Sequence, residues 1–559
     1  MTETLIADLK EIVGARHVIT NPRSMERFCK GYRSGSGPAL AVVRPGTLLE
    51  QWRALEAIIA ADKIVITQAA NTGLTEGSTP KDAYDRDVVI LSCSRIKGLH
   101  LLRGGEQIIG LPGTTLFDLE QKLRPLGRNP HSVIGSSSIG ASIIGGVCNN
   151  SGGSLCERGP SYTELALYGQ VTANGDLKLV NELGLDLGET PEEILTRLEA
   201  GDFDMDAAMP EGRNASDPDY TDVVRDIGSD RPSRYNNDKR LLRGVSGCAG
   251  KLMVFAVRLD TFPNYEREKA FYIGTNDPGD IAELRAHILT NFETLPVSAE
   301  YMHRDCFDYA DKYGKDTLVM IDKLGTDRLP GIFALKGAVD ARLNKFKPTR
   351  ALTDRFMQVL ARIWPEHLPR FLRDYRDRFE HHLILKMHDG GIEEAEAFLP
   401  GFLEERGAEM RVCTPREAKI AGLHRFAAAG AAVRYGHVHA DEVEDILALD
   451  IALRRNDQAF FETLPEEITK DLVGKIYYGH MMCHVMHQDY IVKKGVDTKA
   501  LKAKMLAILD ERGAEYPSEH NVGHLYEAKA DLAAFYKACD PTNSLNPGIG
   551  KMSRKKHYA

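Results

Sequence analysis

The most constraining stretch of this chain is V-I-T-Q-A-A-N-T-G-L-T-E-G-S-T-P, from Val65 to Pro80. An apolar run leads into a polar loop that carries Gly73 and Gly77. Glycine permits positive φ angles and a close approach of the backbone, so successive N–H groups can form a concave nest for phosphate oxygens. The stretch therefore predicts a strand followed by an anion-binding loop, without choosing among the common nucleotide cofactors.

Patterns of strand and helix surround this loop. Thr47 followed three residues later by Glu50 predicts the capped start of a helix, and apolar residues then recur at helical spacing. A second helix is expected after Thr115. The predicted strands are Ala39–Arg44, Lys63–Thr67, Val88–Ser92, Gln107–Leu111 and Met253–Leu259.

Small residues dominate Gly135 to Ser154, and isoleucines interrupt them at spacing that fits a small packed helix. We interpret this stretch as backbone wrapped around a ligand rather than as a linker.

Gly184 to Asp238 is acidic and weakly periodic, which predicts a surface excursion. G-C-A-G-K-L, from Gly247, lacks the P-loop spacing, and no G-x-G-x-x-G follows a strand. These absences disfavour an NTP site and a nicotinamide-binding Rossmann fold.

Composition excludes several classes of protein. A chain of 559 residues should hold more than one domain. Its net charge of -9 argues against nucleic acid as the main partner, and no apolar run approaches the length of a membrane span. Nine scattered cysteines without a C-x-x-C pair, and an N-terminus without a signal peptide pattern, predict reduced thiols in the cytoplasm.

The segment from Arg342 to Arg378 is basic within this acidic chain. Phe356, Ile363 and Trp364 lie among its arginines at near-helical spacing. A basic helix with an apolar stripe and an interfacial tryptophan is typical of docking on anionic phospholipid. A solvated helix packed on its own domain fits the same pattern, so the residues leave both interpretations open.

Histidines gather toward the C-terminal end. In a helix, His480, His484 and His487 would align; in a strand, His480 and His484 would share a face opposite His487. Either arrangement could hold a divalent ion with Glu519 as an acidic partner, and the need for a metal stays open. His520, beside Glu519, combines an imidazole with an orienting carboxylate, as a general base requires.

In their order along the chain, these motifs resemble those of vanillyl-alcohol-oxidase-type flavoproteins. The resemblance rests on Q-A-A-N-T-G-L-T-E-G-S, L-P-G-T-T-L, the small-residue stretch, G-C-A-G-K-L and D-P-T-N-S-L-N-P-G-I-G-K. More closely, the chain is similar to the bacterial family of respiratory quinone-dependent D-lactate dehydrogenases. That similarity runs nearly end to end and includes Glu300–Asp305, Asp441–Asn456 and His487–Gly495.

The resemblance implies FAD bound without a covalent link. On the matching motifs, the pyrophosphate would contact Ala69, Ala70, Asn71, Thr72, Gly73, Gly77 and Ser78. Further cofactor-binding residues carried over from the family are Gly135, Ser142, Gly152 and Val254.

The resemblance also implies a catalytic set. Relatives carry G-H-x-G-D-G-N-x-H and E-H-G segments, which correspond here to Gly479-His480…His487 and Glu519-His520-Asn521. The glycine and acidic residues of the first segment are missing here, and Asn521 replaces the last glycine of the second. His520 is the expected base, with Glu519 beside it. Arg425 stands where relatives have an arginine that could pair bidentately with the substrate carboxylate.

The implied fold is α+β. It has a two-subdomain FAD-binding domain of vanillyl-alcohol-oxidase type, and an α+β cap domain with an antiparallel sheet and a basic helical insertion that docks on the membrane. The expected boundaries are 1–260 for the FAD-binding domain, 261–300 and 379–510 for the cap, 301–378 for the insertion, and 511–559 for the completion of the FAD-binding domain. Residues 417–440 could join the docking region.

The implied reaction is oxidation of D-lactate to pyruvate, with hydride passing to flavin N5 and electrons to membrane quinone. The protein would be peripheral on the cytoplasmic face of the inner membrane, in contact with anionic phospholipid. Alternatives are oxidation of another D-2-hydroxy acid, oxygen as the acceptor, a metal-dependent hydrolase built on the histidines, and a membrane-surface protein that holds flavin only structurally. The quinone type and the oligomeric state are left open.

Overall fold

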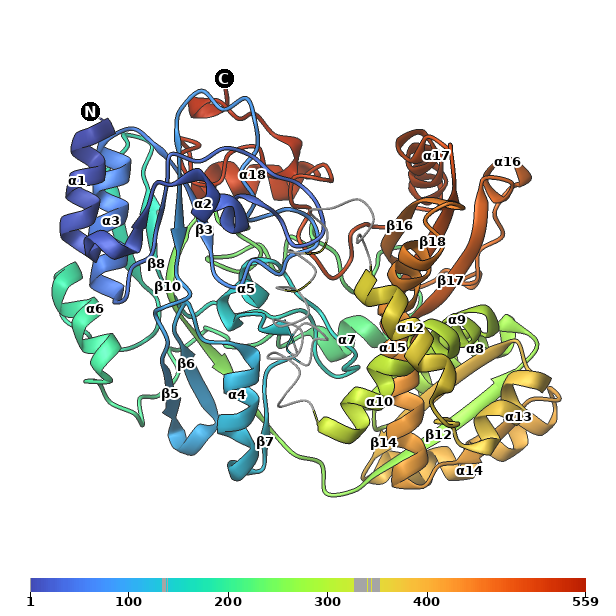
Figure 1. The fold of residues 1–559 in the computed structure, drawn as a ribbon. Coiled ribbons are helices and arrows are strands. Elements are labelled where there is room, and N and C mark those ends of the chain that lie inside the picture. The colour runs from blue at the N-terminus through green and yellow to red at the C-terminus, as the bar shows by residue number, and fades with distance from the viewer. Residues whose placement is uncertain (1, 133–136, 138, 326–338, 340–342, 344–351) are drawn as a thin grey trace.

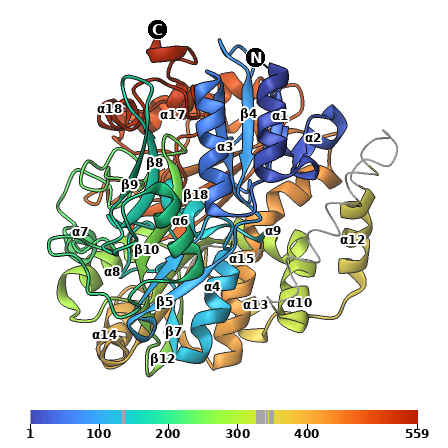
Figure 2. The ribbon, with the colours of Figure 1, turned by 90° about the vertical axis from the view of Figure 1, so that its left-hand side faces the viewer.

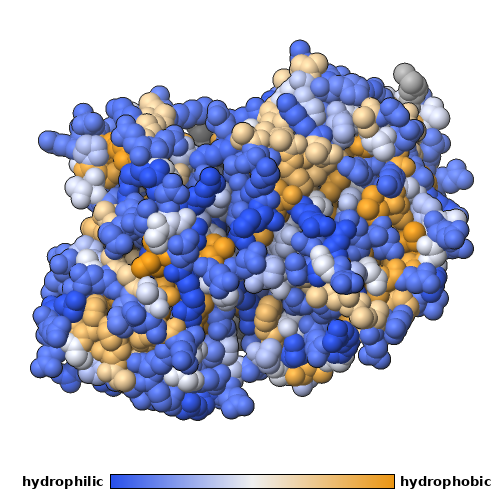
Figure 3. Space-filling model, turned by 180° about the vertical axis from the view of Figure 1, so that it is seen from behind, coloured by the Kyte–Doolittle hydropathy of each residue, from blue (hydrophilic) through white to orange (hydrophobic). Residues whose placement is uncertain are grey.

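A computed structural model describes residues 2–132, 137, 139–325, 339, 343 and 352–559. Two bodies of sheet and helix lie side by side, and both chain termini belong to the same body (Figure 1). Seen from behind, hydrophilic residues cover most of the molecule, and hydrophobic residues form separate patches between them (Figure 3).

The first sheet has the strand order β1-β2-β4-β3, in which β2, β4 and β3 run parallel. The helices α1 and α3 pack on each other beside it (Figure 2). Thr47 caps α3 as predicted, because its hydroxyl accepts from the Glu50 N–H at 3.0 Å. Glu50 itself accepts from Gly46 N–H at 2.6 Å. The elements are α1 (Thr2–Val13), β1 (Val18–Ile19), α2 (Pro22–Cys29), β2 (Ala41–Val43), α3 (Leu48–Ala60), β3 (Ile64–Gln68) and β4 (Val88–Ser92).

The second sheet is antiparallel, with the order β5-β6-β10-β8-β9, and β10 lies at its centre. A short pair, β7 and β11, lies outside it. The strands are β5 (Leu99–Leu102), β6 (Gln107–Gly110), β7 (Arg128–Asn129), β8 (Ala166–Val171), β9 (Leu177–Asn181), β10 (Met253–Asp260) and β11 (Phe262–Pro263). The helices of this part are α4 (Leu116–Leu123), α5 (Ile143–Cys148), α6 (Pro191–Ala200) and α7 (Tyr220–Arg225).

The end of the chain returns to the first sheet after α18 (Ala530–Cys539). Leu545 forms a parallel bridge with Val65 of β3. The Val65 N–H donates to Ser544 O and the Asn546 N–H donates to Val65 O, each at 2.9 Å. The C-terminal segment therefore extends the edge of an N-terminal sheet.

The second body is built on a seven-stranded antiparallel sheet with the order β15-β12-β14-β13-β17-β18-β16. Its strands are β12 (Glu268–Thr275), β13 (Ser298–His303), β14 (His381–His388), β15 (Glu409–Val412), β16 (Val443–Ala452), β17 (Leu472–His480) and β18 (Val485–Lys493). The mixture of helices and antiparallel sheets confirms the predicted α+β class.

Helices cover both faces of this sheet. On one face, α8 (Pro278–Asn291), α14 (Gly390–Glu404) and α17 (Thr498–Glu511) contribute to a core around Phe271 and Tyr301. A core around Tyr272 and Phe307 lies on the other face. The helices there are α9 (Arg304–Tyr313), α10 (Lys315–Leu324), α12 (Leu352–Ile363), α13 (Arg370–Arg378) and α15 (Pro415–Val438), and the short α16 (Glu466–Thr469) precedes β17. Within the described residues we find no helix with the length and hydropathy of a membrane span.

Candidate active site

Side-chain hydrogen bonds shape the loop after β3. Gln68 Nε2 donates to the carbonyl oxygens of Phe28 and Ser78, each at 2.7 Å. Ser78 Oγ donates to Asn71 Oδ1 at 2.8 Å, and Asn71 Nδ2 donates to Lys30 O at 2.9 Å. Asn71 has a φ of 53°, a left-handed conformation of the kind that builds an anion nest.

The glycines of this loop leave room for a ligand. A Cβ atom added at Gly73 would meet no atom within 4 Å, and at Gly77 the nearest atom would be Asn149 Oδ1 at 3.6 Å. Packing inside the protein therefore does not explain the missing side chains, and the open space beside the loop is compatible with the close approach of a cofactor. The residues present fit the pyrophosphate of FAD.

Gly73→Val is expected to weaken FAD binding by about 5- to 150-fold and so to lower the FAD content of the purified protein. The added methyl groups would fill the space beside the loop, and overpacking costs about 1–3 kcal/mol, where 1.4 kcal/mol is a factor of ten. The ratio of flavin to protein absorbance measures this content. Gly401→Val on α14 is the matched control, because a Cβ at Gly401 also meets open space. Full flavin occupancy in Gly73→Val would refute the placement of the loop.

The C-terminal segment closes over the same loop. Asn546 Nδ2 donates to Gly77 O at 2.7 Å, and the His524 N–H donates to Thr75 O at 3.0 Å. Gly523 has a φ of 54°, and a Cβ there would lie 2.0 Å from Thr75 O, so this contact requires glycine. Residues from opposite ends of the chain thus meet at the predicted anion-binding loop.

The other predicted cofactor residues have varied surroundings. Ser142 Oγ accepts from the Gly145 N–H at 3.0 Å and so caps α5. Val254 is buried in β10, and its carbonyl oxygen accepts from Gln51 Nε2 at 3.3 Å. Gly135 lies outside the described residues. Ala69, Ala70 and Thr72 belong to the loop itself. Their contacts with FAD remain predictions.

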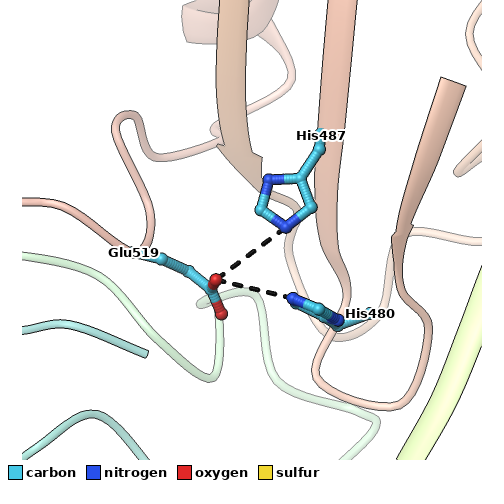
Figure 4. A group of neighbouring side chains, drawn as sticks. All are labelled: His480, His487 and Glu519. Carbon is cyan, nitrogen blue, oxygen red and sulfur yellow. Dashed lines mark ion pairs between the residues drawn. The ribbon is translucent and has the colours of Figure 1, made fainter. Parts of the chain in front are cut away.

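Three predicted catalytic side chains converge (Figure 4). His480 ends β17 and His487 lies in β18, so two adjacent antiparallel strands bring the imidazoles together, with ring centroids 4.9 Å apart. Glu519 reaches them from the segment after α17. Its Oε2 lies 3.5 Å from His480 Nε2 and 3.8 Å from His487 Nε2. The open choice between helix and strand is therefore resolved as a hairpin.

The turn of this hairpin removes His484 from the group. His484 has a φ of 59°, and its Nδ1 lies 2.9 Å from the carbonyl oxygen of Arg454. Burial lowers the pKa of His484 well below its ordinary value. It is therefore a neutral structural imidazole.

Glu519 and His480 belong to a row of buried, alternating charges. Arg234 Nη1 lies 2.8 Å from Glu519 Oε1, and His480 Nδ1 lies 2.6 Å from Glu300 Oε1. Arg425 Nη2 lies 3.0 Å from Glu300 Oε2. The row runs Arg234, Glu519, His480, Glu300, Arg425. Every member has a neighbour of opposite charge, which offsets the cost of burial.

This row holds His480 in its charged form. Burial would lower the pKa of His480, but the carboxylates of Glu300 and Glu519 outweigh it and raise the pKa to about 10. Burial would raise the pKa of Glu519, yet His480 and Arg234 hold it well below the usual range. These carboxylates therefore favour the imidazolium form of His480 at neutral pH.

Protonation of His480 restricts its chemistry. An imidazolium donates both N–H groups and has no lone pair for a proton or a metal. His480, His487 and Glu519 do offer ligand atoms that all lie within 4.8 Å of one another. A divalent ion could bind this group only if His480 lost a proton.

His520 does not pair with Glu519, so our expectation from their adjacency is wrong. The Glu519 carboxylate turns toward the buried charges, whereas the His520 side chain is 36% exposed and its Nε2 lies 3.9 Å from Asp450 Oδ2. Asp450 also accepts from the Glu519 N–H at 2.8 Å and lies 2.8 Å from His487 Nδ1. Asp450 therefore orients the segment that carries the candidate base.

Arg425 lies on the inner side of α15, where it faces Glu300 and the ring of Tyr478, 4.4 Å from the ring centroid. It is buried. The bidentate pair between Arg425 and the substrate carboxylate stays a prediction.

Sequence reasoning missed Arg234. Arg234 lies in the segment Gly184–Asp238. We predicted this segment to be a surface excursion, but the prediction is wrong for its C-terminal end, because Arg234 is only 1% exposed. Its Nη2 donates to the carbonyl oxygens of Leu155 at 2.7 Å and Arg158 at 2.8 Å. Gly152 lies against the same pair, because a Cβ there would be 2.7 Å from Glu519 Oε1. No local pattern marked Arg234 as buried.

Comparison with solved structures defines the class of protein. The chain matches p-cresol methylhydroxylase with substrate bound at a TM-score of 0.59 and 11% identity, covering 99% of this chain and 97% of that chain. It matches alkyldihydroxyacetonephosphate synthase at 0.58 and 10%, covering 98% and 84%. At such identities the likeness concerns the fold alone. The fold is that of the vanillyl-alcohol-oxidase-type FAD-binding flavoproteins, as the sequence predicted.

Comparison of sequences assigns the chain to one family within this fold. A family model described as "D-lactate dehydrogenase, membrane binding" matches residues 270–558. A quinone-dependent D-lactate dehydrogenase from Escherichia coli (strain K12) is 58% identical, covering 100% of this chain and 98% of the relative. One from Haemophilus influenzae is 54% identical, covering 100% and 99%. The chain belongs to the family of quinone-dependent D-lactate dehydrogenases.

Proposed function

We propose that this protein oxidises D-lactate to pyruvate with non-covalently bound FAD and passes the electrons to a membrane quinone. The observation that carries the proposal is 58% identity, over the whole chain, to a relative named quinone-dependent D-lactate dehydrogenase. When bound beside the loop after β3, FAD would supply the two-electron chemistry as the acceptor of the substrate's hydride. Binding, orientation and proton transfer belong to the protein.

The charge row suits an anionic substrate. His480 remains a cation at neutral pH and so attracts the carboxylate of D-lactate. Glu519 and Glu300 keep His480 charged and fix both of its nitrogens. His520 is the proposed base for the C2 hydroxyl proton. Unlike His480, it is partly exposed, and the carboxylate oxygen paired with it, Asp450 Oδ2, lies 3.9 Å from its Nε2.

Quinones dissolve in the bilayer, so the protein would work at a membrane surface. The family description "membrane binding" supports a peripheral attachment. We place the protein on the cytoplasmic face of the inner membrane, in contact with anionic phospholipid.

Anaerobic flavin absorbance tests this function. D-Lactate should bleach the flavin, and L-lactate should not. A soluble quinone analogue should then reoxidise the flavin faster than air does. Acid precipitation should release the flavin into solution, as expected for non-covalent binding.

The other outcomes separate the alternatives. Bleaching by a different D-2-hydroxy acid but not by D-lactate would change the substrate, and faster reoxidation by air would indicate an oxidase. No bleaching by any D-2-hydroxy acid would contradict catalysis.

A further inference from the structure

A tight hairpin follows α2 in the first body. Lys30 and Ser36 form an antiparallel bridge, and the Gly31 N–H donates to Gly35 O at 3.0 Å. These contacts make the chain turn back on itself within a few residues, with Arg33 in the middle of the turn. We call residues 30–36 the tip loop.

The tip loop is held on the loop after β3, where we place the pyrophosphate of FAD. Asn71 Nδ2 donates to Lys30 O at 2.9 Å, and Ser34 Oγ donates to Glu76 Oε1 at 2.6 Å. Gly35 has a φ of 81°, and a Cβ there would lie 2.5 Å from Glu76 Cδ, so this close approach requires glycine. The backbone on both sides of Arg33 is therefore fixed, whereas the Arg33 side chain is exposed.

The charge of Arg33 acts on a strand of the second body. Asp489 lies two residues after His487 in β18, so both side chains are on the same face of the sheet. Burial raises the pKa of Asp489, and the positive charge of Arg33 is the strongest effect that opposes this shift. Because such an effect weakens with distance, the Arg33 guanidinium lies close to Asp489. The tip loop thus reaches from the first body toward the sheet that carries His487.

A second neighbour places Arg33 beside the candidate bases. Burial and Asp450 raise the pKa of Tyr526 to about 12, and Arg33 opposes them. The Asp450 carboxylate itself lies 2.8 Å from His487 Nδ1 and 3.9 Å from His520 Nε2. Arg33 is therefore at the edge of the candidate active site, on the side of His487 and His520.

Arg33 differs from the other arginines of the site because it has no ionic partner. Arg234 pairs with Glu519, and Arg425 pairs with Glu300. Arg33 forms no ion pair with any residue that the structure describes. A free guanidinium binds an anionic ligand without giving up a buried ion pair, whose loss would offset the new contact.

We propose that Arg33 binds the carboxylate of the substrate, with two guanidinium N–H groups donating to the two carboxylate oxygens. The planar fork of arginine matches a carboxylate in this geometry. His480 then adds longer-range attraction, and Arg33 makes the direct contact in place of the pair predicted for Arg425. This inference rests on the proposed function for the substrate, a D-2-hydroxy acid.

The position of Arg33 also suits the reaction. In a 2-hydroxy acid, C2 is bonded directly to the carboxylate carbon. A carboxylate held at the tip loop therefore keeps the C2 hydroxyl near the imidazoles beside Asp450. The contacts of Lys30 and Ser34 tie this anchor to the loop that is proposed to hold FAD, so substrate and cofactor are positioned by one rigid unit.

The concentration dependence of anaerobic flavin reduction tests the contact in the full-length, FAD-loaded protein. Arg33→Ala should raise the Kd for D-lactate about 10- to 150-fold, as expected for the loss of a hydrogen-bonded charge pair. The rate at saturating D-lactate should fall much less, because Arg33 is not the proposed base. Arg23→Ala is the matched control and should bind D-lactate as the wild type does, since Arg23 is exposed on the neighbouring α2.

Two further measurements separate a guanidinium fork from a simple positive charge. Arg33→Lys keeps the charge but loses the fork, so it should recover only part of the affinity. Added guanidinium ion should restore part of the D-lactate affinity of Arg33→Ala. An unchanged Kd in Arg33→Ala, or full affinity in Arg33→Lys, would overturn the proposed contact. Weaker binding in Arg425→Lys together with normal binding in Arg33→Ala would assign the carboxylate to Arg425.

Flavin content and the wild-type reaction separate this inference from the proposed function. Arg33→Ala should contain as much FAD as the wild type, because the tip loop holds the loop after β3 through Lys30 and Ser34. Loss of FAD from Arg33→Ala would show that Arg33 supports the cofactor loop instead of the substrate. Bleaching of the wild type by D-lactate with an unchanged Kd in Arg33→Ala would refute this inference alone. No bleaching of the wild type by any D-2-hydroxy acid would refute the proposed function.

Discussion

Glu519→Ala is expected to lower the free energy of unfolding by about 3–5 kcal/mol, the typical cost of removing one partner from a buried ion pair. The variant would leave the Arg234 guanidinium, which is 1% exposed, and the His480 imidazolium without their shared carboxylate. Urea denaturation measures this difference. Glu519→Gln, which keeps the shape of the side chain, is the second variant if Glu519→Ala does not fold.

The pH dependence of stability should also change in Glu519→Ala. Because the pKa of His480 is raised to about 10, its pairing stabilises the fold fully below about pH 6.5, and this contribution is lost as the pH rises through about 10. Without Glu519, the pKa of His480 falls, so the loss of stability at alkaline pH becomes smaller.

An exposed pair provides the control. Glu396→Ala removes the partner of Lys269 at 2.6 Å, where both side chains are more than a third exposed. Such a pair contributes at most about 1 kcal/mol. Equal losses in Glu396→Ala and Glu519→Ala would contradict the energetic role assigned to the charge row.

His520→Ala is expected to slow flavin reduction by D-lactate by about 10²–10⁴, the usual contribution of a positioned general base. FAD content and stability should stay near those of the wild type, because the His520 side chain is partly exposed and has no short contact with the charge row. Anaerobic stopped-flow absorbance measures the rate.

Two further variants make this test specific. His287→Ala, whose imidazole stacks on Phe398 at 3.7 Å, should reduce flavin normally. His487→Ala tests a second candidate imidazole, whose Nδ1 lies 2.8 Å from Asp450 Oδ1. Normal reduction in His520→Ala together with a large loss in His487→Ala would transfer the role of base to His487.

Local sequence signals predicted much of the fold. Val88–Ser92 is a strand over the predicted residues, and Thr115 caps a helix as expected. The strand predicted over Met253–Leu259 continues one residue further, to Asp260. These elements depend on apolar periodicity and on caps within a few residues, which a single sequence displays directly.

The charge row could not be predicted in this way. Arg234 and Glu519 are separated by 285 residues, and Glu300 and His480 by 180. Nothing near Arg234 distinguishes it from the acidic segment around it, so its burial depends wholly on tertiary contacts. Adjacency was misleading for His520, because the side chains of neighbouring residues can turn to different surroundings.

The ion pairs of the basic segment from Arg342 to Arg378 could not be predicted from the sequence either. Its composition suggested free arginines, yet Arg373 reaches Asp311, 62 residues earlier in the chain. The apolar residues between the arginines could be recognised from the sequence, but their outward direction could not. That direction depends on the burial of Asp354 and Gln358 against neighbouring helices.

The contact between Asn546 and the cofactor loop bears on how the protein is made. Gly77 and Asn546 are 469 residues apart, so a ribosome working at about 5–20 residues per second adds Asn546 roughly 25–95 s after Gly77. During that interval the loop lacks its clamp. The proposed FAD site is therefore completed only late in biosynthesis.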